Sequence, residues 1–88
     1  MTDVYVERPG IELKKKIFSK GLNMSQFAYQ IEVPVSRISD IVSGKREITL
    51  DSAKKFAKYF GDSVQYWLYR QSDYNIYKDQ HKSQYLQY

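Results

Sequence analysis

Apolar residues recur at helical spacing along nearly the whole chain, and each run is bounded by a glycine, a proline or a polar capping residue. The first run is closed by Gly21 and predicts a helix over residues 10–20. A short second helix is expected after Asn23, because Gln26 stands three residues later and can complete a capping box. The pattern at this end of the chain is therefore helical.

Pro34 separates the second helix from a third. It lacks an N–H and pushes Val33 toward extended geometry, yet a proline is tolerated at a helix start. The third helix is expected to begin at Val35 and to end at Gly44, which can adopt the left-handed conformation of a helix stop. Its predicted buried residues are Ile38, Ile41 and Val42.

Two more helices follow, with Thr49 and Ser63 as their expected N-caps and Gly61 between them. The fifth helix is expected to run as far as Tyr74 or Tyr77. The core residues predicted for this half of the chain are Phe56, Phe60, Trp67 and Leu68.

Apart from a weak hint in residues 2–6, no stretch shows the period-two alternation of a buried strand, so the fold class expected is all-α, with five helices in one domain. We expect an N-terminal arm over residues 1–8 and the folded domain over residues 9–78. Residues 79–88 have no clear apolar stripe and are expected to form a loose tail.

Composition narrows the possible functions. The 88 residues include no cysteine, which excludes disulfides and thiolate sites and fits a reducing cytoplasm, and no apolar run long enough for a membrane span. The net charge of +4 suits an anionic partner without requiring one. His81 is the single histidine and has no ligand-spaced partner, so we expect no metal site, no cofactor and no catalysis.

The second and third helices are short and joined by about three residues, which is the sequence form of a helix-turn-helix. Such a motif places its second helix in the major groove of DNA. If the apolar residues of the third helix face inward, a polar face remains for the groove, and two cations follow where the DNA backbone would run. These outward residues are Val35, Ser36, Arg37, Ser39, Asp40, Ser43, Lys45 and Arg46.

The segment from Leu22 to Arg46 is similar to the Cro/cI-like (XRE) helix-turn-helix domains. The longer string VPVSRISDIVSGKREIT…DSAKKFAKYFG…YWL…QSDY resembles the HigA (VapI-type) antitoxins, over about Pro9 to Tyr77. The resemblance implies a dimer that binds operator DNA, represses its own operon and neutralises an RNA-cleaving toxin of the HigB type.

The same resemblance implies roles for individual residues. Val35 and Ser36, with Asp40 one turn on, fall where base edges are contacted, and Arg37 falls on a base or a phosphate. Ser43, Lys45 and Arg46 match the end that contacts the DNA backbone. Asn23, ahead of the second helix, is a further DNA-binding candidate.

The chain departs from the family pattern in the helix-turn-helix itself. Met24 stands where the family usually has a glutamine that holds a phosphate. Glu32 stands where the turn usually has glycine, so it must accept an unfavourable φ, at a cost of about 1 kcal/mol, or reshape the turn.

Two questions stay open at this level. Asp40 can accept from a cytosine amino group or pair with Arg37, and the second role is slightly favoured. The protein can also be a phage-type repressor without a toxin, or a helical interaction module that has lost DNA binding.

For the expected homodimer, the interface candidates on the last helix are Tyr66, Tyr69, Tyr74 and Tyr77.

Overall fold

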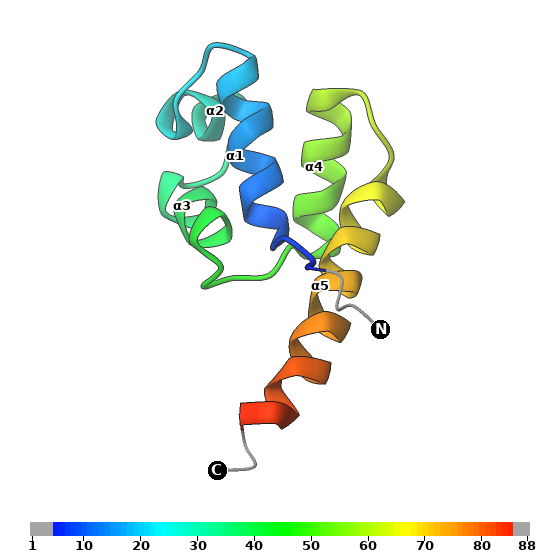
Figure 1. Cartoon of the computed structure of the whole chain (residues 1–88). Coiled ribbons are helices and arrows are strands. Elements are labelled where there is room, and N and C mark those ends of the chain that lie inside the picture. Colours follow the sequence, from blue (N-terminus) through cyan, green and yellow to red (C-terminus); the bar gives the residue numbers. More distant parts are fainter. Residues whose placement is uncertain (1–4, 86–88) are drawn as a thin grey trace.

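The computed structural model describes the backbone of residues 5–85 and the side chains of residues 5–81. Five α-helices and no strand lie in this range, which confirms the predicted all-α class (Figure 1). In chain order the helices are α1 (Pro9–Ser19), α2 (Met24–Gln30), α3 (Val35–Ser43), α4 (Leu50–Phe60) and α5 (Val64–Tyr85).

The helix starts lie where the capping residues predicted them. The side chain of Asn23 accepts a hydrogen bond from the Gln26 N–H at 2.8 Å, and Gln26 accepts one from the Asn23 N–H at 2.9 Å, which completes the capping box. Thr49 accepts from the Ser52 N–H at the start of α4. Ser63 accepts from a backbone N–H of the first turn of α5 at 3.0 Å. These local interactions confirm the predicted starts of α2, α4 and α5.

The predicted end of the last helix is wrong. α5 continues past Tyr74 and Tyr77 to Tyr85, so residues 79–85 of the expected loose tail are helical, and residues 86–88 lie outside the described residues. No glycine or proline interrupts the sequence from Val64 to Tyr85, and contacts one turn apart, such as the ring of His81 at 4.1 Å from that of Tyr77, support the helix without an apolar stripe. In Figure 1 this second half of α5 projects away from the other helices.

In the core α4 packs on α5 and α1 packs on α3. A chain of aromatic rings joins α2, α4 and α5. Phe27 stacks on Phe60 with ring centroids 5.3 Å apart, and Phe56 meets Trp67 edge-on at 5.3 Å. The predicted core residues Ile38, Ile41, Phe56 and Trp67 are buried, whereas Val42, Phe60 and Leu68 are partly buried against them. No helix in the described part of the chain is long and apolar enough to cross a membrane.

Candidate nucleic-acid interface

Helix α3 turns one face to the core and the other to solvent. Ile38 and Ile41 are buried, while Val35 remains 45% exposed. Ser36, Ser39 and Ser43 are also exposed, as are Lys45 and Arg46 beyond the helix, and Arg37 and Asp40 are half-buried. The residues expected to contact a DNA groove or the DNA backbone thus lie on one helix and the loop that follows it, at least partly exposed.

The turn between α2 and α3 is closed by backbone hydrogen bonds. The N–H of Val33 donates to the carbonyl of Ala28 at 3.0 Å, and the N–H of Glu32 donates to Tyr29 at 3.2 Å. Glu32 has a φ of 60°, the one positive φ at a non-glycine residue among those described. The expected unfavourable φ is therefore present, and the chain adopts the turn without the glycine that would suit it.

The C-terminal end of α3 fixes the loop that carries the two cations. Gly44 is left-handed with a φ of 90°. The N–H of Lys45 donates to the Asp40 carbonyl at 2.8 Å, and the N–H of Arg46 donates to the same oxygen at 3.2 Å. These bonds tie the backbone of Lys45 and Arg46 to the last turn of α3.

The slightly favoured pairing of Asp40 with Arg37 is not formed. The ion pairs within residues 5–81 lie within α1 or join α1 to Glu7, Asp62 and Arg70, and none includes Arg37 or Asp40. A pair on an open helix surface contributes only about 0.3–0.5 kcal/mol, which offsets little of the entropy lost in ordering the arginine. The carboxylate of Asp40 is therefore left for another partner.

Asn23 is the N-cap residue of α2, and this role accounts for its position. Its side-chain oxygen is engaged by the Gln26 N–H in the capping box of α2. A DNA contact by Asn23 stays a prediction, and it would have to come from the rest of the amide group.

The four tyrosines expected at a dimer interface have different surroundings. Tyr66 points to α1, where its hydroxyl donates to Glu12 at 2.8 Å, and its ring meets Trp67 edge-on at 5.3 Å. Burial and the hydrogen bond to Glu12 raise the pKa of Tyr66. Tyr69 is 66% exposed, and Tyr74 and Tyr77 are half-buried and stack on each other at 6.4 Å. Tyr66 is thus used within the protomer, whereas Tyr69 is accessible.

Three residues that support this surface were missed in the sequence reasoning. Gln71 of α5 is 8% exposed and accepts a hydrogen bond from the backbone N–H of Ile48, in the loop after α3. Arg8 donates from Nε to the Val42 carbonyl at the end of α3. Gly10 lies against the same end, where an added Cβ would be 2.2 Å from the Ile41 carbonyl oxygen. Local patterns do not show such contacts because the partners are far apart in sequence.

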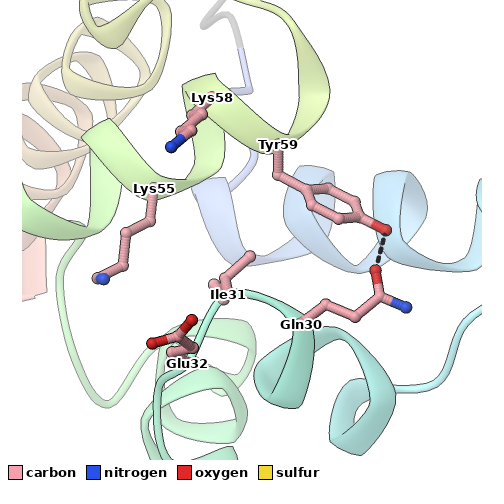
Figure 2. Close-up of a pocket in the computed structure, with 6 residues that line it drawn as sticks. All are labelled: Gln30, Ile31, Glu32, Lys55, Lys58 and Tyr59. Atoms are coloured by element: carbon pink, nitrogen blue, oxygen red, sulfur yellow. Dashed lines mark hydrogen bonds between the residues drawn. The ribbon is translucent and has the colours of Figure 1, made fainter.

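A pocket of about 430 Å³ lies between the turn after α2 and the surface of α4 (Figure 2). The hydroxyl of Tyr59 donates to Gln30 at 2.6 Å on one side, and Figure 2 shows the side chains of Lys55 and Glu32 on the other. Its remaining lining residues are Ile31 and Lys58. No group of three or more metal-ligating side chains occurs among the described residues.

Residues 13–67 match the family model described as helix-turn-helix. The chain belongs to the XRE-type helix-turn-helix family. Proteins of this family are DNA-binding regulators and antitoxins rather than enzymes, as expected from the sequence.

This XRE-type domain is 36% identical over 69 residues to virulence-associated protein I of Dichelobacter nodosus. The match covers 77% of the chain and 64% of that relative, so the chain spans about two thirds of the relative's length.

Solved structures place the XRE-type domain among HigA proteins. It matches an addiction module antidote protein of the HigA family from Coxiella burnetii with a TM-score of 0.85 and 32% identity, covering 91% of this chain and 88% of that one. It also matches the HigA antitoxin of Pseudomonas aeruginosa, solved with the higBA promoter, with a TM-score of 0.80 and 25% identity, covering 91% and 90%. These neighbours and virulence-associated protein I together confirm the resemblance to HigA and VapI-type proteins.

Proposed function

We propose that this protein is a dimeric antitoxin of the HigA type, which binds the operator of its own operon and neutralises a co-encoded RNA-cleaving toxin of the HigB type. The observation that carries the proposal is the likeness along most of the chain to HigA proteins, one of them solved with promoter DNA. An autorepressor acts where its operator is, so we place this protein in the cytoplasm.

In this proposal α3 is the recognition helix. Val35 and Ser36 contact base edges from its leading end, with Ser39 beside them and Arg37 directed to a base or a phosphate. Ser43, Lys45 and Arg46 contact the adjoining DNA backbone. There each neutralised phosphate adds affinity that depends on salt but not on DNA sequence. The exposure of these side chains and the fixed loop after Gly44 support this arrangement.

The test is a fluorescence anisotropy titration with the promoter of the protein's own gene and with random duplex DNA, at several salt concentrations. Ser36→Ala should change the preference between the two DNAs. Lys45→Ala should weaken binding to both, and the slope of log affinity against log salt should become shallower by about 0.9 for each protomer bound, which is about 1.8 for the proposed dimer. If the unmodified protein shows no preference for the promoter at moderate salt, DNA-dependent repression is excluded and the interaction-module alternative gains support.

Asp40 is proposed to accept a hydrogen bond from a cytosine amino group, because its carboxylate forms no ion pair with Arg37. Asp40 is also the one acidic residue of α3, and its negative charge disfavours contact with a phosphate. Asp40→Ala removes both the negative charge and the hydrogen-bond acceptor, so it should raise the affinity for random DNA and lower discrimination at one C·G pair of the operator by about tenfold. An equal gain of affinity for operator and random DNA would show that Asp40 reads no base.

The homodimer is proposed to form through α5, whose second half projects from the rest of the molecule. Tyr69 and Ile76, two turns apart on this helix, are 66% and 55% exposed, and with Tyr74 and Tyr77 they would supply apolar contact area. A dimer reads two half-sites about 34 Å apart and gains affinity over a monomer. Sedimentation at micromolar concentration should give a dimer, and Tyr69→Ala should shift it toward monomer. A monomeric unmodified protein would refute this part.

The proposed toxin partner can be tested by expressing the gene that neighbours this one. A small basic reading frame beside this gene should arrest growth when expressed alone, and co-expression of this protein should restore growth. If no such frame is present, or growth is not restored while operator binding holds, the protein is a free-standing repressor without a toxin.

A further inference from the structure

Arg8 lies across the C-terminal end of α3, although it precedes α1. Its Nε donates to the Val42 carbonyl at 3.2 Å. A Cβ added to Gly44 would be 3.1 Å from the Cδ of Arg8, so the arginine stem lies directly over the bare glycine. Gly10 lies just as close to the carbonyls of Ile41 and Val42. The segment from Arg8 to Gly10 therefore covers the end of the proposed recognition helix.

The guanidinium at this position has spare hydrogen-bonding capacity. An arginine has five N–H donors in a rigid fork, and the Val42 carbonyl uses one of them. Among the residues whose side chains the structure describes, no carboxylate lies within ion-pair distance of Arg8. Both terminal nitrogens thus remain available beside the loop that carries Lys45 and Arg46.

The location favours a DNA phosphate as the partner. The last carbonyls of a helix carry partial negative charge, which repels phosphate. At the end of α3 the positive charge of Arg8 offsets this repulsion. Lys45 immediately follows the glycine that Arg8 covers, and Arg46 comes next, so two exposed cationic residues adjoin the end of α3 that Arg8 covers. A planar guanidinium held at one nitrogen can still bind phosphate through the other two.

We propose that Arg8 is an additional phosphate-binding residue, which clamps the DNA backbone beside the end of α3 while it anchors the N-terminal arm to that helix. This inference rests on the proposed DNA binding by α3. It extends the DNA-contacting surface to a residue that is 34 positions from its anchor in the sequence.

The test compares Arg8→Gln, Arg8→Lys and the matched control Lys14→Gln in the full chain, by anisotropy titration with the promoter of its own gene and with random DNA between 50 and 200 mM salt. Lys14 is an exposed cation of α1 over the Phe18 ring, so its variant removes the same charge from a side chain that contacts a ring of its own helix. Circular dichroism establishes that each variant is folded at the temperature of the titration.

Arg8→Gln can still donate to the Val42 carbonyl but has no charge. Its slope of log affinity against log salt should be shallower by about 0.9 for each protomer bound, which is about 1.8 for the proposed dimer, so that its deficit relative to the unmodified protein shrinks by about twelvefold from 50 to 200 mM salt. Arg8→Lys and Lys14→Gln should keep the original slope. A role confined to anchoring the arm would weaken binding without changing the slope.

The inference is overturned if folded Arg8→Gln has the slope of the unmodified protein, or if Arg8→Lys has the slope of Arg8→Gln. It is also overturned if Lys14→Gln changes the slope equally, because the effect would then be one of net charge. Failure of the proposed function is a different result, in which the unmodified protein itself shows no preference for the promoter.

Discussion

The side-chain oxygen of Gln71 accepts a hydrogen bond from the backbone N–H of Ile48 at 2.9 Å. The two residues belong to α5 and to the loop between α3 and α4, and both are buried. The amide nitrogen of Gln71 donates in turn to Asn75 at 3.0 Å. The last helix thereby holds the loop that presents Lys45 and Arg46.

Gln71→Leu should lower the free energy of unfolding by about 1–3 kcal/mol, because the buried N–H of Ile48 loses its acceptor. It should also weaken DNA binding, since the loop after α3 becomes less restrained. Urea unfolding and anisotropy titration measure the two effects. Gln65→Leu changes an exposed glutamine of the same helix and should alter neither. Equal stability of the two variants would show that the Gln71 bond contributes nothing.

Gly10→Ala should destabilise the protein by about 3 kcal/mol or more. Its Cβ would be 2.2 Å from the Ile41 carbonyl oxygen and 2.6 Å from that of Val42, and these backbone atoms can move only if α1 and α3 separate. Thermal unfolding tests this. Gly21→Ala is the control for a glycine with a positive φ but nothing within 4 Å of an added Cβ, and it should cost only about 1 kcal/mol. Similar losses in both variants would contradict a close approach at Gly10.

Glu32→Gly should stabilise the protein by about 0.5–1 kcal/mol, because glycine adopts the φ of 60° without the strain that an L side chain suffers there. For a domain of this size the melting temperature should rise by about 4 °C. Glu32→Ala removes the same charge but keeps the strain, so it should bring no gain. If both variants gain equally, the charge and not the backbone limits stability at this turn.

Tyr66→Phe should lower the free energy of unfolding at pH 7 by about 1–2 kcal/mol, since Glu12 loses its hydrogen bond to the hydroxyl. Burial and this bond raise the pKa of Tyr66 in the folded state. The contribution of the hydroxyl is therefore complete below the unfolded pKa of about 10 and is lost as the pH rises through the folded pKa.

The difference between the unmodified protein and Tyr66→Phe should accordingly shrink as the pH is raised above 10, in urea unfolding followed from pH 7 to pH 11. Tyr69→Phe alters an exposed hydroxyl of the same helix and should give a small difference that does not vary with pH. A Tyr66→Phe difference that stays constant to pH 11 would contradict the raised pKa.

The helix-turn-helix could be predicted from local chemistry. Asn23 and Gln26 cap each other across three residues, Pro34 precedes the first residue of α3, and Gly44 ends that helix in the left-handed conformation. Each of these features depends on neighbours within one turn of the chain, which is why the order of residues reveals them. The φ of Glu32 was one of two outcomes expected from the resemblance to the family, whose turn usually has glycine, and the structure shows that this outcome occurs.

The end of α5 was missed for a different physical reason. An apolar stripe marks the part of a helix that packs on a core, and the stripe ends before the helix does. Beyond Tyr77 the helix is maintained by residues of adequate helix propensity and by contacts such as that of Tyr77 with His81. Burial patterns therefore set the limit of the packed domain but not the limit of the helix.

The sequence by itself determined the five helices, the interruption before Pro34 and the polar face of α3, because capping, apolar periodicity and the restrictions of proline act over a few residues. The tertiary structure alone decided that Arg8 covers the end of α3, that Gln71 holds the loop after it, and that Tyr66 faces Glu12 rather than solvent. These pairs are 34, 23 and 54 residues apart. Only the packing of α1, α3 and α5 brings them together, and no local pattern encodes such distances.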